Sequence, residues 1–155
     1  RRPPGDGAYV AEISVQGFKD LTEIRLFLME LLAKLAVKRV TDEEIQEMEE
    51  LIGRLRETRE RSQTLRIGSQ FFRKIYQATG NETLARILQT LHNQVSRLWF
   101  VVPKEKNPST ELVEDYESIV AALRARDERK CIEALRENKL RFVRLVKQAI
   151  LDDTA

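Results

Sequence analysis

The chain has 155 residues, of which 42% are hydrophobic and 34% charged, a mixture that suits one domain of amphipathic helices with solvated outer faces. Lysine and arginine number 27 against 25 for aspartate and glutamate, so a net charge of +2 implies no strong field for nucleic acid. No apolar run approaches the ~20 residues of a membrane span, and the first residues lack the apolar segment of a secretory signal.

Residues 1–17 are rich in glycine and proline, and they include a short alternating run from Ala8 to Ile13. This composition predicts a loop, a short extended segment and a linker. We therefore expect the helical domain to occupy residues 18–155.

The first helix is expected to run from Asp20 to about Val40, because Asp20 and Glu23 have the spacing of a capping box. Its apolar residues cover most of the circumference, which predicts burial on more than one side. Arg25 lies beside the main apolar stripe. It is either a surface arginine with a packed aliphatic stem or a cation directed at an acidic ligand.

The second helix is predicted to begin after a capping box at Thr41, and residues 56–63 continue it either as helix or as a loop. The third helix carries a face of five residues and should end where Gly80 permits a left-handed conformation. That face consists of Gly68, Phe71, Phe72, Ile75 and Thr79. Asn81 is expected to cap a fourth helix that reaches about Phe100.

The fifth helix should begin at a cap formed by Ser109 or Thr110, and Asp127 should cap the last helix. Tyr116 places a hydroxyl group inside the apolar stripe of the fifth helix. Asn138 interrupts the inner face of the last helix, where an unpartnered amide costs ~1 to 3 kcal/mol. It either bonds to a neighbouring helix or makes a polar contact inside a ligand cavity.

The sequence contains no constellation typical of an enzyme, such as a G-x-S-x-G motif, a phosphate-binding glycine loop or a C-x-x-C pair. Cys131, the single cysteine, lies on an inner helical face that disfavours the thiolate, and a reducing cytoplasm is its simplest location. His92, the single histidine, is more typical of a structural residue than of a metal ligand. We expect a helical domain that binds a small molecule. The alternative is a protein-interaction module that uses Trp99, Phe100 and residues 101–109.

Five segments of the predicted helices, residues 20–25, 32–36, 39–45, 71–84 and 119–127, are similar to signatures of one known family. They resemble the C-terminal effector-binding and dimerisation domain of GntR-type transcription regulators, in the fatty-acid-responsive (FCD) subfamily. Residues 5–10 are similar to the wing that ends the winged helix-turn-helix DNA-binding domain of that family. The resemblance implies an all-α antiparallel bundle of six or seven helices, a homodimer, and DNA binding through a preceding domain.

Many members of this family hold a divalent metal with an aspartate and a histidine four residues apart and two later histidines. By their spacing to Asn81 and Asp127, these positions fall here on Gly68, Phe72, Tyr116 and Asn138. The resemblance therefore implies no metal and no other cofactor, but it still implies a cavity at these four residues.

The effector implied by the resemblance is an organic acid with an apolar tail or an acyl thioester, with Arg25 as the candidate anion anchor. Its binding would favour one arrangement of the dimer and so change operator affinity. The sequence leaves open which helices form the dimer interface.

Overall fold

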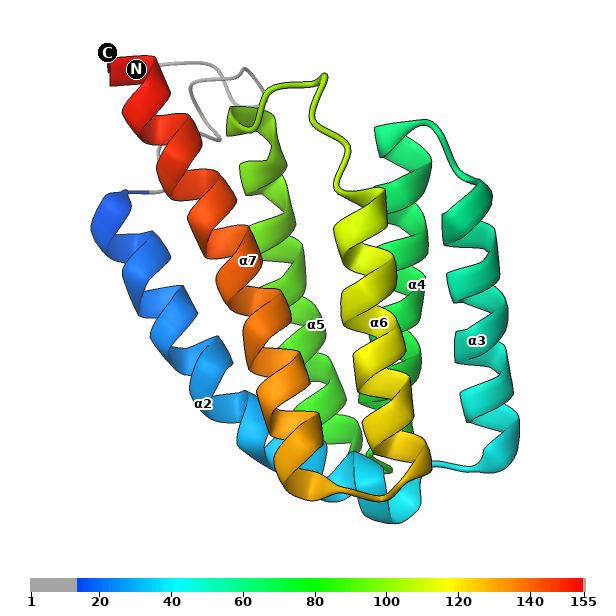
Figure 1. The fold of residues 1–155 in the computed structure, drawn as a ribbon. Helices are drawn as coiled ribbons and strands as arrows, with labels where there is room; N and C mark the ends of the chain where they lie inside the picture. The colour runs from blue at the N-terminus through cyan, green and yellow to red at the C-terminus, as the bar shows by residue number, and fades with distance from the viewer. Residues whose placement is uncertain (1–13, 155) are drawn as a thin grey trace.

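The computed structural model describes residues 14–154, and over this range the chain consists of helices without strands (Figure 1). Six α-helices and one 3-10 helix follow in the order α2 (Val15–Arg39), α3 (Asp42–Glu57), α4 (Arg61–Ala78), α5 (Glu82–Ser96), η1 (Arg97–Val101), α6 (Ser109–Arg124) and α7 (Glu128–Thr154). The predicted all-α bundle is confirmed. The wing-like residues 5–10 lie outside the described residues.

Helix α2 begins five residues earlier than the sequence pattern predicts. The side chain of Ser14 accepts a hydrogen bond from the backbone N–H of Gly17 at 2.9 Å, so Ser14 is the N-cap. The predicted capping box at Asp20 is wrong, because that residue already lies inside the helix, where its carboxylate accepts from Gln16. Residues 15–17, which the composition suggested for the linker, are therefore helical.

The other predicted caps are mostly confirmed. Thr41 and Glu44 form the reciprocal capping box that starts α3. Gly80 adopts a φ of +64° after the end of α4, a conformation that glycine adopts without strain. The side chain of Asn81 then accepts from the backbone of Leu84, and Asp127 accepts from Lys130 at the start of α7.

Two helix ends differ from the prediction. Helix α5 ends at Ser96, and residues 97–101 tighten into the 3-10 helix η1 instead of completing a regular helix to Phe100. Ser109 is the first residue of α6 and not its cap, since the flanking position is Pro108, which has no capping side chain. Residues 58–60 form a short connection, and Arg61 already lies in α4.

Helix α7 packs between α2 and α6, and α3 lies at the opposite edge against α4 and α6 (Figure 1). Most buried apolar side chains form one large cluster, the main core, which includes Met29, Leu32, Leu55, Phe71 and Leu135. A smaller terminal cluster joins Phe18, Leu98, Val102 and Val146, with Trp99 and Phe142 packed against it. No helix in the described range is both long and apolar enough to cross a bilayer.

Candidate functional site

A pocket of about 130 Å³ lies inside the bundle between α2, α4, α5, η1, α6 and α7. Its apolar wall includes Phe72, Leu112, Trp99 and Phe142. All five residues singled out from the sequence line it, namely Arg25, Gly68, Phe72, Tyr116 and Asn138. The geometry brings these side chains together, while their role in binding an effector stays a prediction.

Arg25 is a buried residue, with 8% of its surface exposed, and so the surface alternative for this side chain is excluded. Its guanidinium donates a hydrogen bond to the hydroxyl of Tyr76. Burial lowers the pKa of Arg25 and raises the pKa of Tyr76 to about 12, so the tyrosine stays neutral and gives Arg25 no counter-charge. No carboxylate of the described residues forms an ion pair with Arg25.

Lys139 is the second cationic group of the pocket, and it is not among the residues that the sequence pattern indicated. Only 4% of its surface is exposed, and its Nζ atom lies 3.5 Å from the centroid of the Phe72 ring. Burial, followed by repulsion from Arg25, holds the pKa of Lys139 well below its usual range. A signal was present in the sequence, since residue 139 lies four residues after Leu135 and three before Phe142 on the inner face of α7.

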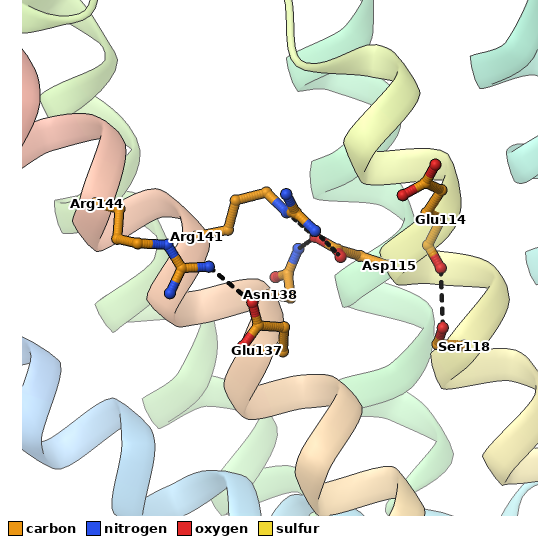
Figure 2. A network of polar contacts seen from close by, with 7 residues as sticks. All are labelled: Glu114, Asp115, Ser118, Glu137, Asn138, Arg141 and Arg144. Carbon is orange, nitrogen blue, oxygen red and sulfur yellow. Dashed lines mark hydrogen bonds and ion pairs between the residues drawn. The ribbon is translucent and has the colours of Figure 1, made fainter.

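Asp115 joins α6 to α7 through hydrogen bonds to Asn138 and Arg141 (Figure 2), two residues that line the pocket. Its carboxylate is buried and accepts two hydrogen bonds of 3.0 Å from Arg141, through Nε and Nη2. It also accepts from Nδ2 of Asn138 at 3.1 Å. The Asn138 amide thus bonds to a neighbouring helix and lines the pocket as well. These bonds to Asp115 raise the pKa of Arg141, which keeps its charge.

The position of the Tyr116 side chain explains why residue 68 is a glycine. The Tyr116 ring stacks on Phe71, with centroids 4.1 Å apart and planes 6° from parallel. A Cβ atom at residue 68 would lie only 2.7 Å from the Tyr116 hydroxyl oxygen, so the absent side chain makes room for that hydroxyl. Burial raises the pKa of Tyr116 and keeps the group protonated.

Two further polar groups of the pocket wall lack a partner. Among the described residues, four buried side-chain atoms have no hydrogen bond, and two of them, Thr64 Oγ1 and His92 Nδ1, belong to residues that line this pocket. His92 Nε2 lies 3.1 Å from the Ser69 hydroxyl. Burial, with repulsion from Lys139, Arg25 and Arg73, lowers the pKa of His92 to about 3, so the imidazole is neutral. These groups can hydrogen-bond to a polar guest.

The pocket does not fit a divalent metal. Gly68 and Phe72 provide no donor atom, and the donor nitrogen of Asn138 is directed at Asp115. The Lys139 amine over the Phe72 ring and the Arg25 guanidinium favour negative over positive guests. Within the described residues, no three histidine, cysteine, aspartate or glutamate side chains gather as a metal site.

Cys131 offers no nucleophile at neutral pH. Its side chain is fully buried in the main core, and burial raises its pKa to about 12. The thiol therefore stays protonated, and the thiolate that covalent catalysis needs is not formed.

A family model for the FCD domain matches residues 20–138. The HTH-type transcriptional regulator McbR of Escherichia coli strain K12 is 24% identical over 139 residues, and the match covers 86% of this chain and 63% of McbR. The solved structure of E. coli McbR/YncC has a TM-score of 0.78 at 22% identity, covering 88% of this chain and 66% of that chain. Streptococcus agalactiae GntR has a TM-score of 0.66 at 21% identity, covering 81% and 57%. The chain thus spans less than two thirds of these relatives, and the two solved structures share its fold.

Proposed function

Since the chain belongs to the FCD domain family of GntR-type transcription regulators, we propose that it is the ligand-sensing part of such a regulator and binds a small organic acid in the described pocket. One observation carries this proposal. Two basic side chains, Arg25 and Lys139, are buried in one pocket without an ion-pair partner among the described residues. We assign the domain no catalytic role.

The two basic groups favour a carboxylate as the ligand. A buried cation without a counter-charge is costly, and an anion placed between Arg25 and Lys139 compensates both desolvated groups at once. Thr64 and His92 can supply further hydrogen bonds to the same ligand. The aromatic and aliphatic wall then suits a short apolar or aromatic body attached to the acid group.

The size of the pocket narrows the range of acids. Its volume of about 130 Å³ lies below the ~300 to 1,000 Å³ of typical small-molecule sites. A compact acid such as an aromatic or short-chain carboxylate suits that space. An acyl thioester, the larger of the two effector classes that the family resemblance implies, needs a wider pocket.

A homodimer is the second part of the proposal. Three large apolar side chains of α2, Ile24, Phe27 and Leu31, are 50%, 71% and 40% exposed, and Ile87 of the adjacent α5 is 46% exposed. Monomeric proteins rarely expose a contiguous apolar patch of this kind. We propose that a second copy covers this face, and that ligand binding alters how the pair presents a DNA-binding domain to its operator. Such a regulator acts in the cytoplasm, where the DNA is.

The alternative of a protein-interaction module is supported by the exposure of Phe100, at 77%, and of Val101, at 38%. Trp99 is less available, because it packs on Phe142 with ring centroids 4.9 Å apart and lies under Arg61. A partner bound through Phe100 would leave the pocket unused. Ligand-induced stabilisation therefore distinguishes the two functions.

The test is a thermal-shift screen of compact carboxylates, each paired with its uncharged amide, for example benzoate with benzamide. Binding at 100 times Kd stabilises the folded state by about 2.7 kcal/mol, enough for a clear rise in Tm. We expect a rise for one or more carboxylates and none for the matched amides. A screen in which acids and amides behave alike would contradict the proposal.

A further inference from the structure

We propose that a carboxylate enters the pocket together with one proton, which the Lys139 amine takes up as it becomes the second half of a two-cation cradle with Arg25. This inference rests on the proposed function, because it concerns the same pocket. It adds a binding residue, a charge state for that residue, and a measurable link between ligand binding and pH.

The surroundings of Lys139 contain basic and neutral groups but no free acid. Helix α2 contributes Arg25, α4 contributes the Phe72 ring and the neutral Tyr76, and α5 contributes the neutral His92. Helix η1 contributes the uncharged Trp99. Helix α6 contributes the protonated Tyr116 and the carboxylate of Asp115. On α7 itself, Arg141 lines the pocket and is bound to Asp115.

Asp115 does not serve as the counter-ion of Lys139. Both of its carboxylate oxygens are engaged, with Oδ1 accepting from Arg141 and Oδ2 accepting from Arg141 and Asn138. The Asp115 charge raises the pKa of Lys139, but burial and the repulsion from Arg25 both exceed that contribution. In the empty pocket, two positive groups therefore share one desolvated space with no negative charge of their own.

Of the two groups, the lysine is the one that gives up its proton. A guanidinium is delocalised and stays protonated in proteins, whereas a buried lysine readily becomes a neutral amine. The neutral amine is tolerated in the pocket because burial does not penalise it as it penalises the ammonium.

A bound carboxylate shifts Lys139 from the neutral amine to the ammonium form. Its negative charge favours the ammonium form, and the amine takes one proton from solvent without any covalent bond being made or broken. The ammonium then lies over the Phe72 ring, an arrangement that favours a cation. Between the Lys139 pKa of the empty pocket and that of the filled pocket, affinity should fall about tenfold for each unit rise in pH.

The first experiment uses isothermal titration calorimetry of the full chain with benzoate, at one pH in phosphate and in Tris. Because the two buffers differ in ionisation enthalpy, the difference in heat reports proton uptake, which we expect to be about one per benzoate. Lys139→Arg should still bind benzoate but without proton uptake, since the guanidinium is already charged. Lys139→Met should bind at least tenfold more weakly. Lys147→Met, at an exposed lysine of the same helix, should match the wild type.

The outcomes of this titration separate the two proposals. Benzoate binding without proton uptake, equal in the wild type and in Lys139→Met, would overturn this inference and leave the ligand-sensing function standing. No benzoate binding to the wild type, together with no Tm rise for any carboxylate of the thermal-shift screen, would overturn both.

A second experiment needs no ligand. Between the lowered pKa of Lys139 in the folded protein and the pKa of about 10.4 that a lysine has in the unfolded chain, folding releases a proton from Lys139, so stability rises with pH over that interval. Lys139→Met lacks this penalty. We expect the variant to have the higher Tm at pH 7 and the difference to shrink towards pH 10. A difference that does not change with pH would show that Lys139 stays charged in the empty pocket, and would overturn the inference.

Discussion

Two neighbouring groups of buried charged residues differ in whether the fold supplies them with a counter-charge. In the seam between α6 and α7, Asp115 is surrounded by Arg141 and Asn138, and each of the charges has a partner within the fold. One residue further along α7, Lys139 faces Arg25 across the pocket without an acid between them. The seam is complete as the chain folds it, whereas under the proposed function the counter-charge of the pocket comes from a bound anion. Both regions are buried, and what distinguishes them is the presence of a counter-charge within the fold.

The largest effect is expected from breaking the seam. Asp115→Ala removes the only carboxylate bound to Arg141 within the described residues and leaves the Asn138 amide without its partner. Loss of one member of a buried ion pair typically costs ~3 to 5 kcal/mol, and the partial exposure of Arg141 places this case near the lower end. Urea unfolding measures the change.

The matched control for that variant is Glu137→Ala. Glu137 pairs with Arg144 on the solvent side of α7 (Figure 2), and both side chains are more than half exposed. Its removal should cost no more than about 1 kcal/mol. Equal losses for the two variants would erase the distinction between the buried seam and the surface.

A second, smaller loss is expected at the border of the pocket. Gly68→Ala places a methyl group where the Tyr116 hydroxyl lies, and the stacked ring can move only by disturbing Phe71. Overpacking of this kind costs ~1 to 3 kcal/mol. Gly53→Ala is the control, because a Cβ there meets nothing within 4 Å, and it should stabilise α3 by up to about 1 kcal/mol. Thermal unfolding of both variants measures the two changes, and a loss for Gly68→Ala alone would show that the Tyr116 hydroxyl needs the space at residue 68.

The smallest effect on stability is expected inside the pocket. Arg25→Met removes an unpaired buried cation, which is favourable, and leaves the Tyr76 hydroxyl without its partner, which is not. We expect the free energy of unfolding to change by no more than about 1 kcal/mol, while the Tm increase produced by a bound carboxylate disappears. If the ligand-free protein instead lost as much stability as Asp115→Ala, Arg25 would belong with the structural charges.

Local signals in the sequence were sufficient for most helix boundaries. Thr41, Asn81 and Asp127 cap their own helices through bonds that span three residues, so the pattern and the structure agree there. The start of α2 was predicted wrongly because Ser14 and Asp20 are both residues that can cap a helix. The packing of Phe18 in the terminal cluster favours the earlier start, at Ser14.

The charged residues of the pocket were predicted less well, for a physical reason. Periodicity assigns a lysine or an aspartate to the solvent side of a helix, and the burial of Lys139 and Asp115 depends on contacts with other helices. Arg25 and Asn138 were found because they interrupt or border an apolar stripe. The positions of Gly68 and Phe72 came from the family resemblance and not from the residues themselves.

The terminal cluster connects the wall of the pocket to the first turns of α2. Trp99 and Phe142 form part of the pocket wall and also pack against the cluster that holds Phe18 in the first turns of α2. Under the proposed function, a ligand large enough to displace these two rings would act on the N-terminal turns of α2 through this cluster.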